Sequence, residues 1–359
     1  MIRLAHIVAS HAAELVAQDS QRLLPSQRAA LNALQTCRSS MSPKMQLACD
    51  GCSEQSFLPH SCGHRACPHC QAHESQRWID QQLKKLVPDN YFMATFTLPA
   101  EFRALAWQHQ RVMYELITQS AWETVNTFSQ NDKKLCGTAG AVTVLHTHSR
   151  RLDFHPHVHL LMPACAFDRT RRRWRSKEGG YLFNHKALAK VFRAKVLAGV
   201  KHAGLRLPKH YPEEWVVDCK AVGTGEKALI YLGRYLYRGV IQEKNILSCQ
   251  NGLVTFRYQN SETKLIETRT LPAVAFLRLI LQHVLPKGFR RARNFGFLHP
   301  NSKLVQLLQW LKRVVVQPPQ TRPVMRCSCC GGVIKIVRTR IKTWTRRIRI
   351  QGVDLEQAM

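Results

Sequence analysis

Histidines occupy every second position of the stretch HPHVH at residues 155–159, directly before the apolar run LLM. Successive side chains of a β-strand point to opposite faces, so the three imidazoles are expected on one face and the intervening apolar side chains on the other, against a core. Same-face neighbours are about 6.6 Å apart along a strand, so His157 and His159 can converge on one divalent ion, whereas His155 is too far from His159 to join easily. The pattern predicts a metal site; the alternative is the polar, solvent-facing side of an edge strand.

A third ligand is expected from a neighbouring strand. Residues 141–146 and 154–162 read as two strands joined by a turn, and a hairpin between them would bring His146 to face the histidine pair. His148 and Asp153 are the less favoured substitutes for this third position.

Two tyrosines follow in the stretch GTGEKALIYLGRYLYRG at residues 223–239. A helix is predicted to begin near Glu226 and to end at Gly239. Tyr231 and Tyr235 are four residues apart, so their phenols lie on one helical face, about 6 Å from each other. The pair either packs the helix or, beside a metal ion that polarises a phosphate, supplies nucleophiles. Attack by a tyrosine would give a covalent phosphotyrosine and a free 3′ hydroxyl, and two tyrosines permit two such events.

Cysteines cluster near the N-terminus. Cys49 and Cys52 form one C-x-x-C pair, Cys67 and Cys70 form another, and fourteen residues separate the two pairs. Two such knuckles can close a tetrahedron of thiolates around Zn²⁺, which predicts a structural zinc site in this segment. A redox pair or scattered core cysteines are the alternative.

Other cysteines leave the number of metal sites open. Cys37, Cys62 and His64 crowd the same segment, so either the extra thiols lie outside one zinc site or a second ion binds. A third C-x-x-C pair, Cys327 and Cys330, has no obvious partner pair nearby. It either binds metal or belongs to a glycine-rich turn with free thiols.

The charge of the chain predicts a polyanionic partner. The 359 residues include 53 Lys and Arg against 23 Asp and Glu, a formal net charge of +30. Such a field favours nucleic acid over the weaker alternative of a membrane surface, although any one basic cluster can also be a solvated face. The candidate DNA-contacting residues are Arg65, Arg171, Arg172, Arg173, Arg234, Arg238, Arg290, Arg291 and Arg293.

The sequence also narrows the cellular setting. No run of 18 or more apolar residues and no convincing signal peptide is present, which predicts a cytoplasmic protein without a membrane partner and with reduced thiols. No G-x-x-x-x-G-K-[ST] motif occurs, so strand unwinding is expected from host machinery.

In their order, these motifs resemble the two-tyrosine HUH transposases of bacterial rolling-circle insertion sequences, where HUH denotes histidine, hydrophobic residue, histidine. The stretch SCGHRACPHCQ is similar to the family's transposase zinc-binding domain. The resemblance covers nearly the whole chain through the blocks FTLPAEFR (96–103), LHTH (145–148), HPHVHLL (155–161), YLGRYLYRG (231–239) and HVLPKGFRRARNFGFL (283–298).

The resemblance implies roles for the quoted residues. Tyr231 and Tyr235 would be the two nucleophiles, and His157 and His159 would hold Mg²⁺ or Mn²⁺; the choice of His146 as third ligand rests on strand geometry alone. The implied partners are single-stranded or hairpin element ends, target DNA, and the helicase and replication machinery of a bacterial host, near the nucleoid. The implied activity is nicking and joining of DNA strands in transposition.

An α+β fold is expected, with a central antiparallel sheet of the HUH-nuclease type and flanking helices. The expected parts are a helical zinc-binding DNA-recognition domain at 1–88, a catalytic domain with the tyrosine helix at 89–250, and a basic C-terminal DNA-binding region at 251–359. Within the last part, Asn251-Gly252 predicts a hairpin turn, followed by a helix near residues 273–284. A plasmid replication initiator or relaxase with the same chemistry, and a non-catalytic zinc-dependent DNA-binding protein, remain as alternative functions.

Overall fold

The computed structural model describes residues 2–237, 239–260, 262–311 and 324–341. The predicted DNA contact Arg238 lies outside these residues, as does the basic segment after residue 341. Helices and antiparallel sheets both contribute, so the predicted α+β class is confirmed.

Seven strands of the described chain form the central antiparallel sheet, in the order β7-β6-β4-β5-β3-β8, with β12 paired to β4. Their bounds are β3 Tyr91–Thr97, β4 Thr138–His148, β5 Phe154–Pro163, β6 Cys165–Asp168, β7 Arg173–Ser176, β8 Val217–Ala221 and β12 Ala292–Gly296. The predicted hairpin is confirmed as β4 and β5, in which His146 pairs with His157. Because β5 lies between β3 and β4, the alternative of an edge strand is wrong.

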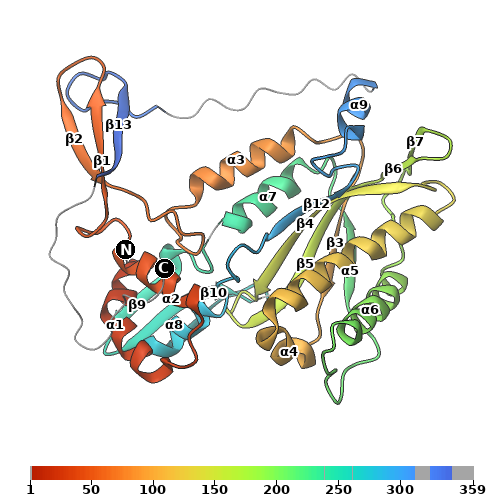
Figure 1. Ribbon diagram of the computed structural model, residues 1–359, viewed down its shortest axis with the longest axis horizontal. Helices are drawn as coiled ribbons and strands as arrows, with labels where there is room; N and C mark the ends of the chain where they lie inside the picture. The colour runs from red at the N-terminus through yellow and green to blue at the C-terminus, as the bar shows by residue number, and fades with distance from the viewer. Residues whose placement is uncertain (1, 238, 261, 312–323, 342–359) are drawn as a thin grey trace.

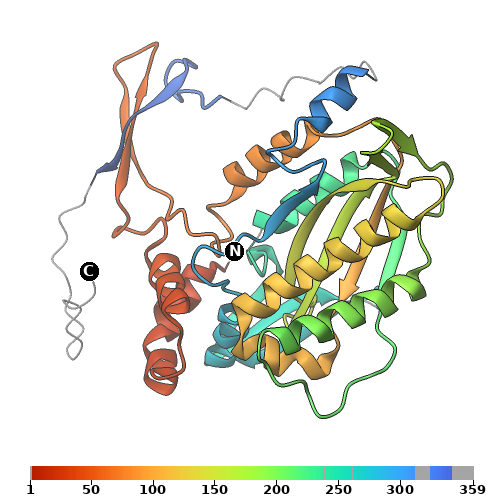
Figure 2. The same ribbon diagram turned by 45° about the vertical axis from the view of Figure 1, so that its right-hand side comes forward.

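One face of this sheet is buried under helices. Val158, Leu160 and Met162 of β5 lie in a core shared with α5 and α6, as the alternation of the sequence predicted. Figure 2 shows these helices along the near face of the sheet. The elements on this side are the 3₁₀ turn η1 Ala100–Phe102 and the helices α4 Arg103–Gln108, α5 Gln110–Asn131 and α6 His185–His202.

The opposite face carries the tyrosine helix. The predicted helix is α7 Glu226–Tyr237, and it lies alongside α3 Ala72–Leu83 (Figure 1). Leu229, Leu232 and Leu236 of α7 pack on β4 and β5 side chains in a second core, close to α9 Leu304–Leu311. The α7 tyrosines are thereby held against the face on which the histidines lie.

A separate core joins the N-terminal helices to the segment of residues 240–284. It contains the helices α1 Leu4–Asp19, α2 Pro25–Thr36 and α8 Ala273–Leu281, the turn η2 Glu243–Asn245 and the sheet of β9 Ile246–Gln250, β10 Leu253–Gln259 and β11 Ile266–Pro272. The predicted turn is confirmed, since Asn251 and Gly252 both have positive φ between β9 and β10. Residues from the predicted N-terminal and C-terminal parts therefore share one core, and packing does not separate them at 88 and 250.

A small ribbon stands apart from these three cores (Figure 1). It consists of β1 Lys44–Cys49, β2 Gln55–Pro59 and β13 Ile334–Ile341, with β1 in the middle of three antiparallel strands. The N-terminal zinc-binding segment and a C-terminal strand are therefore neighbours in space.

Candidate active site and metal centres

Three histidines meet on the inner strands of the central sheet. His146, His157 and His159 each offer a ring nitrogen, and these atoms lie within 4.8 Å of one another. The β4–β5 register brings His146 opposite His157, and alternation adds His159 on the same face. His155 is outside this group, and its Nδ1 lies 3.1 Å from the guanidinium of Arg103.

The surroundings of these imidazoles suit a metal ion. His157 Nδ1 donates to the carbonyl of His155 at 2.7 Å, and His159 Nδ1 is 3.0 Å from the Thr95 hydroxyl, which leaves Nε2 of each ring for a ligand. His146 is 1% exposed, and its Nε2 has no hydrogen-bond partner among the described residues. Burial lowers the pKa of His157 to about 3 and that of His159 to about 4, so the rings stay neutral, the form that binds metal.

Tyr235 lies directly on the histidine group. Its ring stacks on that of His146 with centroids 3.6 Å apart, and its hydroxyl is 2.9 Å from His148 Nε2. Burial raises the pKa of the Tyr235 phenol, so the hydroxyl is protonated at rest. Tyr231, one turn earlier, is 51% exposed, with its ring centroid 6.3 Å from that of Tyr235.

His148 contributes to the site through Tyr235, a role that the sequence did not predict. The sequence offered it as a substitute metal ligand, but the structure brings it to the Tyr235 hydroxyl and leaves it out of the three-histidine group. The signal was present in the LHTH stretch, because residues two apart on a strand share a face. Burial lowers the pKa of His148 well below its ordinary value, so the ring is neutral and can accept a hydrogen bond.

A glycine sets the distance between the tyrosine helix and its neighbour. Gly233 stands between the two tyrosines, and the Ser75 hydroxyl of α3 donates to its carbonyl at 2.9 Å. A Cβ at this position would lie 2.3 Å from Ile79 Cγ1. Only glycine permits this approach, so α3, which directly follows the cysteine segment, fixes the position of α7.

Arg291 fastens the tyrosine helix to the histidine strand. Its Nε donates to the Leu145 carbonyl at 2.9 Å and its Nη1 to the Leu236 carbonyl at 3.0 Å, and these residues adjoin His146 and Tyr235. Its guanidinium carbon also lies 5.5 Å from the centre of the Tyr235 ring. The prediction placed this side chain on DNA, whereas the structure directs it into the protein.

Arg65 is exposed but also makes hydrogen bonds to the main chain of this region. Its guanidinium donates to the carbonyls of Phe289 and Leu285, at 2.9 and 2.8 Å, and so holds the loop that leads to Arg291. Arg65 therefore has a structural role in this loop, and its contact with DNA stays a prediction. Sequence spacing could not show this, because both partners are main-chain atoms more than 200 positions away.

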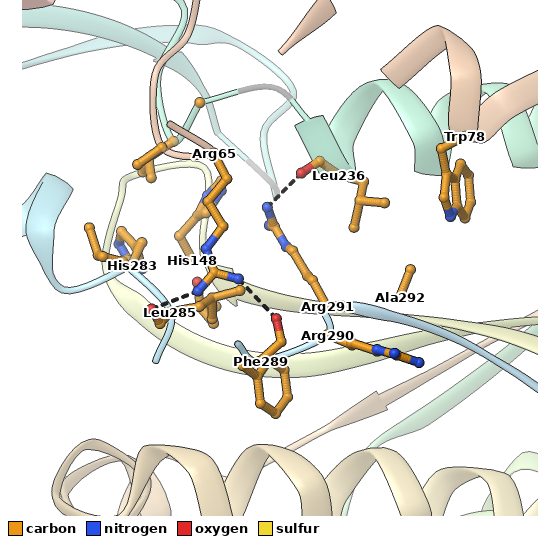
Figure 3. Close-up of a pocket in the computed structure, with 15 residues that line it drawn as sticks. Arg65, Trp78, His148, Leu236, His283, Leu285, Phe289, Arg290, Arg291 and Ala292 are labelled. Atoms are coloured by element: carbon orange, nitrogen blue, oxygen red, sulfur yellow. Dashed lines mark hydrogen bonds between the residues drawn. The ribbon is translucent and has the colours of Figure 1, made fainter. Parts of the chain in front are cut away.

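A cavity of about 280 Å³ opens beside this linkage (Figure 3). Arg65, Arg290 and Arg291 line it together with His148 and His283. Arg290 is exposed, in contrast to the inward Arg291 next to it. A basic cavity that reaches the hydrogen-bond partner of Tyr235 suits a negatively charged ligand.

The remaining predicted DNA contacts lie at several places. Arg234 is exposed on α7, and Arg293 is half-buried, 3.7 Å from a Glu115 oxygen. The segment 171–173 is exposed at the β6–β7 hairpin, which joins β4 at the end opposite His146. Arg171 pairs there with Asp168. The structure brings Arg234 near the tyrosines but not the 171–173 cluster.

The four cysteines predicted to share one zinc ion are divided between two clusters, so this part of the prediction is wrong. Cys67 and Cys70 lie with Cys37 and Cys62, and all four sulfur atoms are within 4.8 Å of one another. Cys37 Sγ is 3.6 Å from Cys67 Sγ and 3.3 Å from Cys70 Sγ. Cys62 lowers the pKa of the Cys37 thiol to about 6 through a hydrogen bond, which favours the thiolate that zinc requires.

The β1–β2 ribbon causes this division. It extends away from the first cluster and carries Cys49 and Cys52 to its far end, where they meet Cys327 and Cys330. His64 is outside both clusters, since its Nδ1 accepts a hydrogen bond from the Ala66 amide at 3.2 Å. The first cluster, Cys37, Cys62, Cys67 and Cys70, is a four-thiolate set of the kind that holds structural zinc.

Clustered histidines on an antiparallel sheet, a tyrosine helix packed on them and a four-cysteine module are the features expected of the two-tyrosine transposases with a zinc-binding module. Known proteins agree with this assignment. A family model described as "Putative transposase" matches residues 140–304, and one described as "Transposase zinc-binding domain" matches residues 7–98.

Two curated relatives extend the match. A protein described as "Putative transposase y4qJ" from Sinorhizobium fredii (strain NBRC 101917 / NGR234) is 30% identical over 328 residues, covering 84% of this chain and 82% of the relative. The transposase of insertion sequence element IS801 from Pseudomonas savastanoi pv. phaseolicola is 28% identical over 275 residues, covering 69% and 63%. The chain belongs to this family of two-tyrosine insertion-sequence transposases with an N-terminal zinc-binding domain.

Family membership favours a DNA-binding transposase over the replication-initiator and relaxase alternatives. Among solved structures, the conjugative relaxase TrwC in complex with mutant OriT DNA aligns with a TM-score of 0.24 and 17% identity, over 35% of this chain and 48% of that chain. In the part of the chain that the structure describes, no helix has the length and apolarity that crossing a membrane requires.

Proposed function

We propose that this protein nicks and rejoins single-stranded DNA in rolling-circle-like transposition through 5′-phosphotyrosine intermediates. Tyr235 and Tyr231 are the nucleophiles, and His146, His157 and His159 hold Mg²⁺ or Mn²⁺. The observation that carries this proposal is the position of Tyr235, whose ring stacks on His146 of the three-histidine group and whose hydroxyl is hydrogen-bonded to the neighbouring His148.

The chemistry follows from the groups around the Tyr235 hydroxyl. A divalent ion, when bound, polarises an oxygen of the scissile phosphate. The Tyr235 oxygen forms a bond to phosphorus while the bond from phosphorus to the 3′ oxygen breaks. The phenolic proton leaves through the hydrogen bond to His148, and the departing 3′ oxygen gains a proton as a hydroxyl. Arg291, 5.5 Å from the ring centre, stabilises negative charge that develops on the phenol.

The two tyrosines are in different surroundings, which supports different roles. Tyr235 is already hydrogen-bonded beside the histidines and is proposed to act first in this arrangement. Tyr231 is exposed one helical turn away and is available for a second transfer, in which target DNA or the other element end is joined. A helix places both phenols on the same face at this spacing.

DNA is proposed to approach along the basic cavity. Arg290 is exposed at its wall and Arg234 is exposed on α7, so the side chains of both can reach phosphates. Single-stranded or hairpin element ends and target DNA are the proposed substrates. A host helicase and the replication machinery would supply single strands in the bacterial cytoplasm, near the nucleoid.

The test is formation of a denaturation-resistant adduct between the full chain and a labelled single-stranded element end in the presence of Mg²⁺ or Mn²⁺. Tyr235→Phe is expected to remove the first adduct, and Tyr231→Phe with Tyr235→Phe to remove all adducts, while DNA binding is retained. Tyr181→Phe is the matched control, because Tyr181 is also an exposed tyrosine but lies outside α7. An adduct in the double variant would refute the nucleophile assignment.

The same assay tests the metal site. His157→Ala is expected to abolish nicking at every Mg²⁺ or Mn²⁺ concentration, because two remaining imidazoles hold such an ion poorly. His155→Ala is the control, since His155 lies on the same strand but outside the three-histidine group. Normal nicking by His157→Ala would remove the metal role from this group.

A further inference from the structure

A second four-cysteine set lies at the far end of the ribbon. Cys49 and Cys52 lie beside Cys327 and Cys330, and the four sulfur atoms are within 4.8 Å of one another. Cys49 Sγ is 3.4 Å from Cys330 Sγ, and Cys52 Sγ is 3.8 Å from Cys327 Sγ, although the members of the second pair are 275 positions apart in sequence. The family's zinc-binding domain, matched at 7–98, contains only half of this set.

The backbone around the four thiols has the form of two metal-binding knuckles. The amide of Gly51 donates to Cys49 Sγ at 3.3 Å, and the amide of Gly332 donates to Cys330 Sγ at 3.4 Å. Such N–H···S hydrogen bonds stabilise thiolate charge. In each half of the set, therefore, one sulfur accepts a hydrogen bond from the amide of a glycine two residues later.

Each knuckle also has a glycine where it meets the other, and a side chain there would be tightly packed. A Cβ at Gly332 would lie 3.0 Å from Cys49 Sγ, and a Cβ at Gly51 would lie 3.2 Å from Cys330 Sγ. The glycines therefore let the two turns approach until their sulfur atoms converge. The backbones of the two turns also meet, since the Cβ at Gly332 would lie 3.3 Å from the Cα of Gly51, and this approach points to one shared ligand.

The chemistry of the set selects the ligand. A disulfide has sulfur atoms about 2.05 Å apart, which is well below both cross-pair distances, and none of the described cysteines is bonded in this way. Four convergent thiolates suit Zn²⁺, which takes four sulfur ligands in a tetrahedron, and do not suit Mg²⁺ or Ca²⁺.

Strand β13, which follows Cys327 and Cys330, makes few other contacts that hold it on the ribbon. β13 pairs with β1, but its side chains are mostly exposed, with Ile336 51% and Val337 56% accessible. A three-stranded ribbon without a hydrophobic core is marginal in water. Leu47 is a buried exception in β1, so backbone pairing and the cysteine set must supply most of the restraint.

We propose that Cys49, Cys52, Cys327 and Cys330 bind a second structural zinc ion that fastens β13 to the N-terminal ribbon. The protein then contains two zinc ions, one in the cluster of Cys37, Cys62, Cys67 and Cys70 and one at the ribbon. The ribbon site is completed only after the C-terminal segment is made, because half of its ligands lie there. Its assembly does not depend on the proposed nicking chemistry.

The test begins with the zinc content of the full-length protein. Two zinc ions per chain are expected in the native protein and one per chain in Cys327→Ser and in Cys330→Ser. The matched control is Cys329→Ser, because Cys329 is exposed, adjoins Cys330 and is outside the four-sulfur set. One zinc ion in the native protein, or two in all three variants, would overturn the proposal, as would iron in place of zinc.

Hydrogen exchange gives a second measurement that does not require activity. Amides of β13 are expected to be protected in native protein and in Cys329→Ser, and to exchange at least tenfold faster in Cys330→Ser. Amides of the central sheet, such as those of β4 and β5, should be unchanged in all variants, which shows that the chain is still folded. Unchanged exchange in β13 after loss of the cysteine would show that strand pairing alone holds it.

Discussion

Replacement of Arg291 by methionine separates a positioning role from a DNA contact. The guanidinium donates to the carbonyls of Leu145 and Leu236, and each hydrogen bond from a charged donor contributes about 1.5–3 kcal/mol. Its contact with the Tyr235 ring adds about 0.5–2 kcal/mol. Burial of the charged guanidinium is itself unfavourable, as its lowered pKa indicates, and methionine removes this cost, which offsets part of the sum. We expect a net loss of about 2–4 kcal/mol in the free energy of unfolding.

The functional loss should be larger than the loss of DNA affinity. Without Arg291, the last turn of α7 is no longer fastened to the strand of His146, and a displacement of about 1 Å can lower a reaction rate about 100-fold. The assays are urea unfolding, the rate of adduct formation, and DNA affinity as a function of salt. The matched control is Arg290→Met, which removes the neighbouring exposed charge and should weaken binding without destabilising the fold.

The salt dependence decides between the two roles. Each phosphate contact on a single strand contributes about −0.7 to the slope of log affinity against log salt concentration. Arg290→Met should reduce that slope by about this amount, and Arg291→Met should leave it unchanged. The reasoning fails if Arg291→Met keeps native stability and loses the slope instead.

Three further outcomes are expected. Gly233→Ala should lower the free energy of unfolding by about 1–3 kcal/mol, because the added Cβ would lie 2.3 Å from Ile79, and the better helix propensity of alanine offsets about 1 kcal/mol of this loss. In urea unfolding, the double variant with Ile79→Ala should lose less stability than the sum of the two single variants. In metal-free protein the pKa values of His157 and His159, about 3 and 4, lie below the unfolded value of about 6.5, so the unfolded chain binds more protons between these values. The free energy of unfolding should therefore fall as the pH decreases from 6.5 to 4. If the slope of this free energy against pH were unchanged in His157→Gln, the reasoning would be contradicted. Arg234→Ala should weaken single-strand binding and reduce its salt slope by about 0.7, measured by fluorescence anisotropy, and an unchanged slope would place the DNA elsewhere.

Several features followed from sequence patterns because they are local. Alternation along 154–162 placed the histidines and the apolar residues on opposite faces of one strand, as the structure confirms. The four-residue spacing of Tyr231 and Tyr235 gave the ring separation on α7. Asn251 and Gly252 specified a hairpin turn. In each case the physical cause is the repeat of one strand, helix or turn.

Other features could not follow from local patterns. The spacing of RRAR could not show that Arg291 turns inward while Arg290 stays outside, because its two acceptor carbonyls belong to β4 and α7. His148 was recognised as a candidate of this region, but its contact with Tyr235 requires α7 to lie across β4. The role of Gly233 could not be predicted from the sequence, because the close approach that requires a glycine there is to the side chain of Ile79 on α3.

The cysteines show most clearly what the sequence determines and what the tertiary structure determines. The sequence by itself determined that C-x-x-C pairs form knuckles, that the chain carries a strong positive charge, and that histidines and tyrosines have the spacing of a site. Only the tertiary structure decided which knuckles meet, by extending the β1–β2 ribbon so that Cys49 and Cys52 leave Cys67 and Cys70 and join a pair from the other end of the chain. The physical reason is that spacing along the chain fixes the shape of one element, whereas the meeting of distant elements depends on how their surfaces pack.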